Sequence, residues 1–269
     1  MRARRLTSAH LLAGVIAFGT VLPFLMVVVL ALSEPFAPTI PQRWPETLTL
    51  ENLRTTLAAS SFVRWSINSA VYSLVSVVVV LLTASMAGYA FAKKRFPGRT
   101  ILFWSFLATL MVPVQATLIP TFVLVSRMGG VDTYWGLIVP TLANSQAVFL
   151  MRQFIRDLPD ELFDAAKVDG ASEWRVYWQI VLPLTRPILA TLGIFVFLWH
   201  WNDFLWPLVV GQSDEMRTLT VGLASLGAES VSLAQVMAGA VISVIPCLLV
   251  FGLLQRHLVR SIASTGIKG

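Results

Sequence analysis

The chain alternates between long apolar runs and short polar segments. Six runs carry almost no charge, at residues 10–32, 66–92, 101–125, 134–151, 188–210 and 235–254. Of the 34 charged residues, 33 lie outside these runs, and the exception is Asp203. Each run has at least 18 residues, and a helix of that length, at about 1.5 Å per residue, can cross a hydrocarbon core of roughly 30 Å. The pattern predicts an all-α membrane protein with six transmembrane helices.

Composition agrees with this fold class. Charged residues make up 13% of the 269 positions and hydrophobic residues 56%, whereas a typical soluble domain is about 25% charged. The net charge of +6 comes from Lys and Arg, which in membrane proteins mark loops beside anionic lipid. We therefore expect the lipid bilayer as a partner and no nucleic acid. The single cysteine, Cys247, excludes an internal disulfide.

The basic residues divide unevenly between the two sides of the predicted bundle. One side consists of segments 1–9, 93–100, 152–187 and 255–269, which hold 15 Lys and Arg. The other side consists of segments 33–65, 126–133 and 211–234, which hold five. By the positive-inside rule, we expect a multi-pass protein of the cell (inner) membrane. Its N-terminus (1–9) and C-terminal tail (255–269) would both be cytoplasmic, and residues 10–254 would form the transmembrane domain.

The first run also resembles a secretory signal peptide in outline. Arg2, Arg4 and Arg5 precede it, and Ala31-Leu32-Ser33 offers a small-residue cleavage site. The run continues to Leu32, however, which is longer than the 7–15 residues typical of a signal core. A retained anchor is the favoured interpretation, and cleavage stays open.

Proline interrupts five of the six runs. The positions are Pro23, Pro113, Pro120, Pro140, Pro207 and Pro246. Proline bends a helix and frees carbonyl groups, which lipid tolerates only where a neighbouring helix or a water-lined cavity satisfies them. The prolines therefore favour a protein that encloses a pathway, although proline is also common in membrane helices generally.

Polar side chains inside the runs are the candidates for lining such a pathway. They are Gln115, Asn144, Gln146, Asn202 and Asp203. An acid in a membrane helix should face protein or water, and the aromatic residues around Asp203 indicate the outer interface, where its cost is smaller. A polar gate and a plain interhelical hydrogen bond are equally open interpretations of Asp203.

Residues 152–187 form the long cytoplasmic segment, and their pattern is helical. Pro159 followed by acidic residues predicts a helix start. Leu162, Ala165 and Ala166 then share one face at helical spacing, and Gly170 is a typical C-terminal stop. Next, Ser172 can cap a second helix that ends at Leu182-Pro183. The segment predicts a helix–turn–helix hairpin that lies on the cytoplasmic face as a docking element.

The same residues resemble the EAA signature of ATP-binding-cassette (ABC) importer permeases. Asp164-Ala165-Ala166 is followed after three residues by Gly170, and nine residues later by Ile180-Val181-Leu182-Pro183. The spacing agrees throughout, and the departure is Asp for Glu at the first position, which keeps the charge. Other segments from about residue 60 to the C-terminus also look like this family, among them 87–91, 95–99, 111–113, 202–207 and 265–269. The chain is similar to the smaller, six-span permease of the maltose-type carbohydrate importers.

That resemblance implies the type I ABC importer permease fold and a division of labour among subunits. The hairpin would be a coupling helix that sits in a groove of a separate ATPase dimer. Its coupling residues would be Asp164, Ala165, Ala166, Gly170, Ile180, Leu182 and Pro183. The tail residues Lys268 and Gly269 would reach the ATPase, and the outer loop 211–234 would contact an extracytoplasmic solute-binding protein. A second, homologous permease would complete a pathway for a sugar or sugar-like solute.

The residues themselves argue against an ATPase site in this chain. A Walker A loop needs Gly-Lys followed by Ser or Thr, and none of the four lysines is followed by either. We therefore expect no enzyme activity and no bound cofactor, with ATP and magnesium used by the partner ATPase. Metal-binding spacings of His and Glu are also absent from the sequence. An ion-coupled secondary transporter is the alternative, but it predicts midplane charges and inverted repeats, and neither is evident.

Overall fold

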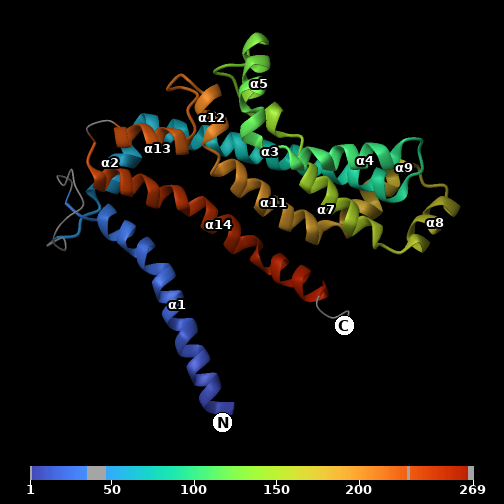
Figure 1. Ribbon diagram of the computed structural model, residues 1–269, viewed down its shortest axis with the longest axis horizontal. Coiled ribbons are helices and arrows are strands. Elements are labelled where there is room, and N and C mark those ends of the chain that lie inside the picture. The colour runs from blue at the N-terminus through green and yellow to red at the C-terminus, as the bar shows by residue number, and fades with distance from the viewer. Residues whose placement is uncertain (1, 35–46, 229–230, 266–269) are drawn as a thin grey trace. The chain divides into compact units, whose positions relative to one another are not determined.

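The computed structural model describes residues 2–34, 47–228 and 231–265, and every regular element in these ranges is helical. The chain divides into two compact units. One is Met1–Ser66 with Leu219–Pro246, and the other is Ile67–Thr218 with Cys247–Gly269. The all-α prediction is therefore confirmed for the described ranges, and Figure 1 shows the helices coloured along the chain.

The first unit combines the N-terminal part of the chain with the segment that ends at Pro246. It contains α1 (Arg2–Ala31), α2 (Glu51–Ala58), the start of α3 (Ser60–Lys93), α13 (Leu219–Ala228) and the start of α14 (Leu233–Thr265). The buried Asn52 ties α2 to the end of α1, because its Nδ2 donates to the carbonyls of Ala31 and Ser33 at 3.0 and 2.7 Å. The Trp65 ring of α3 packs on α13 at Gly222, where any Cβ would collide with it. Glycine at that position therefore permits the close approach of the two helices.

The second unit contains most of α3, the remaining part of α14 and the helices between residues 99 and 210. These are α4 (Arg99–Ala108), α5 (Val114–Arg127), α6 (Tyr134–Ile138), α7 (Ser145–Arg156), α8 (Asp160–Val168), α9 (Glu173–Val176), α10 (Leu182–Leu184), α11 (Arg186–Trp201) and α12 (Leu205–Val210). Two 3₁₀ turns, η1 (Thr109–Met111) and η2 (Val139–Thr141), and a π-helical segment, η3 (Tyr177–Val181), connect them.

The core of this unit has two apolar clusters. The larger cluster joins α3, α7, α8, η3 and α11, and its fully buried members include Val80, Met151, Ile155 and Val181. The smaller cluster joins α3, α5, α6 and α12 around Tyr72, Leu137 and Trp206. In Figure 1, α8 and α9 lie at the end of the unit where α3 finishes and α4 begins. The large cluster therefore anchors the segment that the sequence predicts as a docking hairpin.

Helix α3 lies very close to α7 at Gly88. A Cβ on this residue would lie 2.7 Å from Met151 Cβ and 2.9 Å from the backbone nitrogen of Arg152. Real Cβ atoms do not come that close, and the neighbour is backbone that cannot rotate away. Only glycine fits this crossing, which sits inside the large cluster.

Proline explains the sharpest bend. Helix α4 with η1 turns by 102° into α5 across Val112 and Pro113. The residue before a proline is pushed out of the helical region, and Val112 accordingly has φ −88° and ψ 118°. A second bend, of 75°, separates the run Glu173–Leu184 from α11.

The predicted runs are all largely helical, but they differ in continuity. Within the described ranges, three helices are long and apolar enough to cross a membrane: Leu12–Ala31, Ser61–Lys93 and Leu233–Gln255. Up to five spans result if each bent pair counts as one. The run 134–151 is divided among α6, η2 and α7, and the run 188–210 between α11 and α12. Several membrane-crossing segments are thus present, and the number six stays a prediction.

Candidate functional site

The segment predicted as a hairpin, within residues 152–187, consists of α8, a turn at Gly170 and the continuous run α9–η3–α10; we refer to these elements as the hairpin. Gly170 has φ +68°, in the left-handed region that favours glycine. The Ser172 Oγ accepts a 3.3 Å hydrogen bond from the backbone nitrogen of Arg175. The predicted turn and helix cap are therefore both confirmed.

Helix α8 has one exposed side and one buried side. Leu162 and Ala165 are exposed, whereas Ala166 is buried with Phe163, which sequence reasoning did not single out. Helical spacing places Leu162, Ala165 and Ala166 along one side of α8, and of these three Ala166 is the one turned toward the core. The reason is that the Phe163 ring stacks on Tyr89 of α3, with centroids 6.1 Å apart, and turns its own side of the helix inward.

The outward face of α8 carries the first two residues of the motif. Asp164 and Ala165 are both exposed, and Asp164 pairs with Lys167 at 3.0 Å one turn later. The last part of the motif is placed differently, because Ile180, Leu182 and Pro183 are half-buried in η3 and α10. These residues connect the hairpin to α11. The motif therefore combines an exposed surface with a packed hinge.

Two adjacent lysines at the end of α3 hold the two helices of the hairpin. Lys93 Nζ lies 2.6 Å from Asp160 Oδ1, in the first turn of α8, and donates to the carbonyl of Leu158 at 2.7 Å. Lys94 forms an ion pair with Glu173, in the first turn of α9, and Tyr89 OH donates to the same carboxylate at 3.0 Å. We call Lys93 and Lys94 the lysine clamp.

Burial of the Lys93 side chain makes its contacts in the lysine clamp important for the structure. The Lys93 side chain is 9% exposed, and a buried ammonium needs partners for its charge. The sequence shows Lys93-Lys94 only as a basic pair at the end of an apolar run. Nothing in its spacing identifies the acids 67 and 79 positions further along, so sequence reasoning assigned the pair to membrane orientation and missed this contact.

The ion pair of Asp160 depends on pH in a defined direction. The hydrogen bond from Lys93, and then its charge, lower the pKa of the Asp160 carboxyl below its ordinary value. Ionised Asp160 therefore stabilises the packing of α8 against the end of α3. This stabilisation is lost as the pH falls through the lowered pKa of Asp160. The Asp160 side chain is 81% exposed, so screening by solvent keeps this contribution small.

The candidate pathway residues differ in their surroundings. Gln115 and Gln146 are exposed. Asn144 is the N-cap of α7, because its side chain accepts a 2.8 Å hydrogen bond from the backbone nitrogen of Ala147. Asn202 closes the end of α11 by donating to the Leu198 carbonyl at 2.7 Å. Two of the five candidates thus have a structural task at a helix end, and contact with solute remains a prediction for all of them.

Asp203 belongs to a buried polar group that the sequence did not reveal. Its Oδ2 accepts a 2.9 Å hydrogen bond from the hydroxyl of Tyr72 on α3. The His200 ring meets the Tyr72 ring edge to face at 4.9 Å, and its Nε2 lies 3.2 Å from Thr141 Oγ1. These contacts join α3, η2 and the break between α11 and α12. A hydrogen bond between α3 and the segment after α11 is thus present at Asp203, and a role as a polar gate stays a prediction.

The first part of the outer loop, residues 211–218, is held by side chains from two other segments. Asn68 of α3 donates from Nδ2 to the carbonyls of Glu215 and Arg217, at 2.8 Å each, and its Oδ1 accepts from Tyr134 OH at 2.6 Å. Asp132 Oδ1 accepts from the backbone nitrogen of Ser213 at 2.8 Å. This loop therefore has a defined conformation on the side opposite the hairpin's end of α3.

Comparison with known proteins finds a matching family and related permease proteins. Residues 80–264 match the family described as binding-protein-dependent transport system inner membrane component. The arabinooligosaccharides transport system permease protein AraQ of Halalkalibacterium halodurans is 39% identical over 227 residues, which cover 84% of this chain and 81% of AraQ. The sn-glycerol-3-phosphate transport system permease protein UgpE of Pectobacterium atrosepticum is 38% identical over 202 residues, covering 74% of this chain and 72% of UgpE.

Solved structures share the fold. A chain of a bacterial ABC transporter involved in the import of the acidic polysaccharide alginate superposes with a TM-score of 0.83 at 24% identity, over 95% of this chain and 98% of that one. A bacterial alginate ABC transporter in complex with an alginate pentasaccharide-bound periplasmic protein gives 0.63 at 17% identity, over 95% and 96%. At these identities the likeness establishes the fold.

The long apolar helices define a multi-pass helical membrane protein. The chain belongs to the family of binding-protein-dependent transport system inner membrane components, that is, the permease subunits of ABC importers. The tail residues Lys268 and Gly269, which the resemblance assigns to ATPase contact, lie outside the described residues.

Proposed function

We propose that this chain forms one half of the translocation pathway for a sugar or sugar-like solute. The names of its relatives support this substrate class, since they refer to arabinooligosaccharides, sn-glycerol-3-phosphate and alginate. These compounds share many oxygen atoms and differ in charge. An oxygen-rich solute is therefore the common chemistry, and selectivity among such solutes would lie largely in the binding protein that delivers them.

The hairpin is the observation that carries the proposed mechanism. Its outward face presents Asp164 and the small side chain of Ala165, which allows close approach by another surface. Its inward face is packed into the large cluster, and the lysine clamp attaches both of its helices to α3. In this proposal the hairpin docks on a separate ATPase dimer. A displacement of the ATPase would then pass to α3 and α7 as a unit, because packed cores move rather than deform.

ATP hydrolysis is assigned to that ATPase. None of the lysines in the sequence is part of a Walker A loop, so ATP and magnesium would be bound by the partner. The cytoplasmic tail, including Lys268 and Gly269, would extend toward the ATPase. This arrangement requires that the hairpin and both termini lie in the cytoplasm, as the distribution of Lys and Arg indicates.

Two other partners complete the proposed assembly. The apolar part of α1, Leu12–Ala31, has none of its most hydrophobic window buried within the described chain, which leaves it to lipid and to a second, homologous permease. On the outer side, the loop at 211–218 is held in shape by Asn68 and Asp132. We assign it to contact with the solute-binding protein.

Co-purification tests the proposed subunit composition. The tagged chain, expressed with the genes beside its own, is expected to recover an ATPase and a second permease. An Ala165→Asp variant adds a carboxylate to the exposed face of α8 and should reduce ATPase recovery roughly tenfold, the effect of about 1.4 kcal/mol at an interface. Recovery of the second permease should be unchanged.

The matched control is Thr55→Asp, an equally exposed position on α2, which should leave ATPase recovery at the wild-type level. An active transporter that contains only copies of this chain and no ATPase would contradict the proposal. Equal ATPase recovery with both variants would remove α8 from the docking surface.

A further inference from the structure

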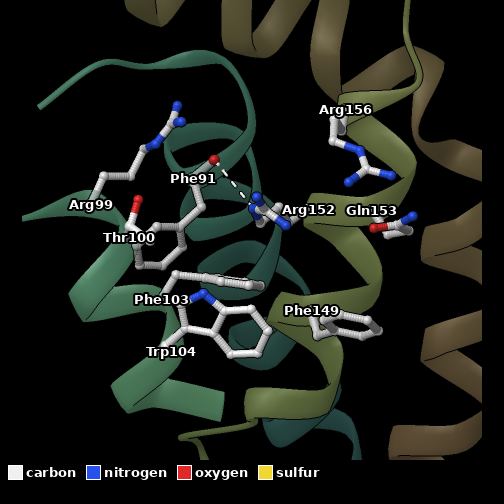
Figure 2. A pocket seen from close by; sticks show the side chains of 9 residues that line it. All are labelled: Phe91, Arg99, Thr100, Phe103, Trp104, Phe149, Arg152, Gln153 and Arg156. Carbon is white, nitrogen blue, oxygen red and sulfur yellow. Dashed lines mark hydrogen bonds between the residues drawn. The ribbon is translucent and has the colours of Figure 1, made fainter.

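A cavity of about 310 Å³ opens between α4 and α7 in the second unit. Arg99 is the first residue of α4, and Arg156 is the last residue of α7, so the cavity lies where both helices have their proposed cytoplasmic ends. It is lined by Phe91, Arg99, Thr100, Phe103, Trp104, Phe149, Arg152, Gln153 and Arg156. Figure 2 shows these side chains. No part of the hairpin contributes to the lining.

The charged residues of this lining all have the same sign. Arg99, Arg152 and Arg156 are basic, and none of the nine lining residues is acidic. Arg99 donates to the Lys94 carbonyl at 2.8 Å and Arg152 Nε to the Phe91 carbonyl at 3.4 Å, while Arg156 pairs with the exposed Asp157 at 3.7 Å. Each of these contacts engages one nitrogen of a guanidinium that carries five N–H donors. Donors therefore remain for an anion at this end of the cavity.

The electrostatics of the cavity favour such an anion. Burial, and then the charges of Arg156 and Arg99, lower the pKa of the Arg152 guanidinium. Like charges held together destabilise one another unless an opposite charge is bound between them. Phosphate is the anion that matches the planar fork of arginine, because it accepts two parallel hydrogen bonds.

The rest of the cavity is aromatic. The Arg152 guanidinium lies 4.1 Å from the centroid of the Phe103 ring, which is a cation–π contact. Phe149 stacks on Phe103 with centroids 6.4 Å apart, and Trp104 stands beside it with 64% of its surface exposed. Figure 2 shows the guanidinium groups toward one end and the rings of Phe103, Trp104 and Phe149 toward the other.

The arginines and the aromatic rings of this cavity lie at different proposed depths in the membrane. Phe103 and Trp104 lie one turn after Arg99 along α4, about 6 Å further in, and Phe149 lies about 10 Å before Arg156 along α7. The charges are therefore at the proposed cytoplasmic surface and the rings are toward the hydrocarbon. An exposed tryptophan at this depth is typical of the lipid interface. A ligand that matches both halves has a phosphate attached to an apolar chain.

We infer that this pocket binds an anionic phospholipid of the cytoplasmic leaflet, with its phosphate between Arg99, Arg152 and Arg156. The acyl chain lies along Phe103, Trp104 and Phe149. The inference rests on the orientation given in the proposed function. It concerns lipid rather than the transported solute, and basic pockets between membrane helices bind acidic headgroups on this side in general. Because α7 leads directly into α8, the bound lipid supports the helix that carries the hairpin.

Lipid retention by the purified transporter complex tests this inference. The complex is equilibrated in mixed micelles with phosphatidylglycerol and phosphatidylcholine of identical acyl chains, and the retained lipids are counted by native mass spectrometry. Wild type is expected to retain phosphatidylglycerol selectively. Arg152→Gln and Arg99→Gln should each lower that preference about fivefold, as expected for the loss of one basic residue at the headgroup.

The matched control is Arg95→Gln, which removes an exposed arginine from the loop between α3 and α4, outside the lining of this cavity, and should keep the preference. Equal retention of both lipids by wild type, or an unchanged preference in both pocket variants, would overturn the inference. Displacement of phosphatidylglycerol by millimolar inorganic phosphate would also overturn it, by assigning the pocket to free phosphate. The measurement requires neither ATP nor solute, so its failure is distinct from failure of the proposed function.

Discussion

Replacing Gly170 with valine is expected to reduce solute uptake by about tenfold while the chain still inserts in the membrane. Gly170 has φ +68°, and a β-branched residue in the left-handed region costs roughly 1–2 kcal/mol. The backbone will relieve that strain by changing the turn, which displaces α8 from α9. In the proposed mechanism the exposed motif face then no longer meets the ATPase in register. Uptake per correctly inserted chain is the quantity to measure.

Gly98→Val is the control for this variant. Gly98 has a similar φ of +78° and open space around it, but it lies in the loop between α3 and α4. It should therefore cost similar stability without affecting the hairpin. Gly170→Asn should recover most of the uptake, since asparagine tolerates this conformation. If the two valine variants transport equally well, the turn at Gly170 has no coupling role.

Replacing Gly88 with alanine is expected to abolish accumulation of folded protein. The added methyl group would lie 2.7 Å from Met151 Cβ and 2.9 Å from the backbone nitrogen of Arg152, so α3 and α7 would have to separate. Overpacking costs typically 1–3 kcal/mol, and more where backbone must move. This crossing anchors the cluster beneath the hairpin. Fluorescence-detected size-exclusion chromatography of the tagged chain would measure the loss.

Gly19→Ala in α1 provides the comparison, because a Cβ there has no neighbour within 4 Å in the described chain. It should accumulate as wild type does. A normal elution peak for Gly88→Ala would mean that α3 and α7 are further apart than the structure places them.

The apolar runs and the hairpin were predictable because each depends on local signals. Hydrophobic length, the acidic start at Asp160, the glycine stop at Gly170 and the serine cap at Ser172 act within a few residues of one another. The structure has each of these features. Proline predicted the breaks inside the runs only in part: Pro113 and Pro140 lie at breaks, whereas Pro23, Pro120 and Pro246 lie inside continuous helices. Whether a proline breaks its helix, and at what angle, depends on what the two halves pack against.

Contacts between distant segments were not predictable from one sequence. The lysine clamp joins residues separated by 67 and 79 positions, and Tyr72 reaches Asp203 across 131. Helical spacing alone also left the inward side of α8 undecided, since Phe163 and Leu162 are adjacent and both apolar. Phe163 is the residue that faces inward, because its ring stacks on Tyr89 of α3. That contact depends on how α3 and α8 pack together, which helical spacing does not reveal.

ATP dependence of uptake decides whether this chain works as the permease of an ABC importer. The complete assembly, reconstituted in proteoliposomes with its solute-binding protein, would be offered labelled sugars with and without ATP on the hairpin side. We predict uptake that requires ATP, stops when the partner ATPase carries an inactive Walker A lysine, and persists when ionophores collapse all ion gradients. Uptake that continues without ATP and stops with the ionophores would contradict the account and identify an ion-coupled transporter instead.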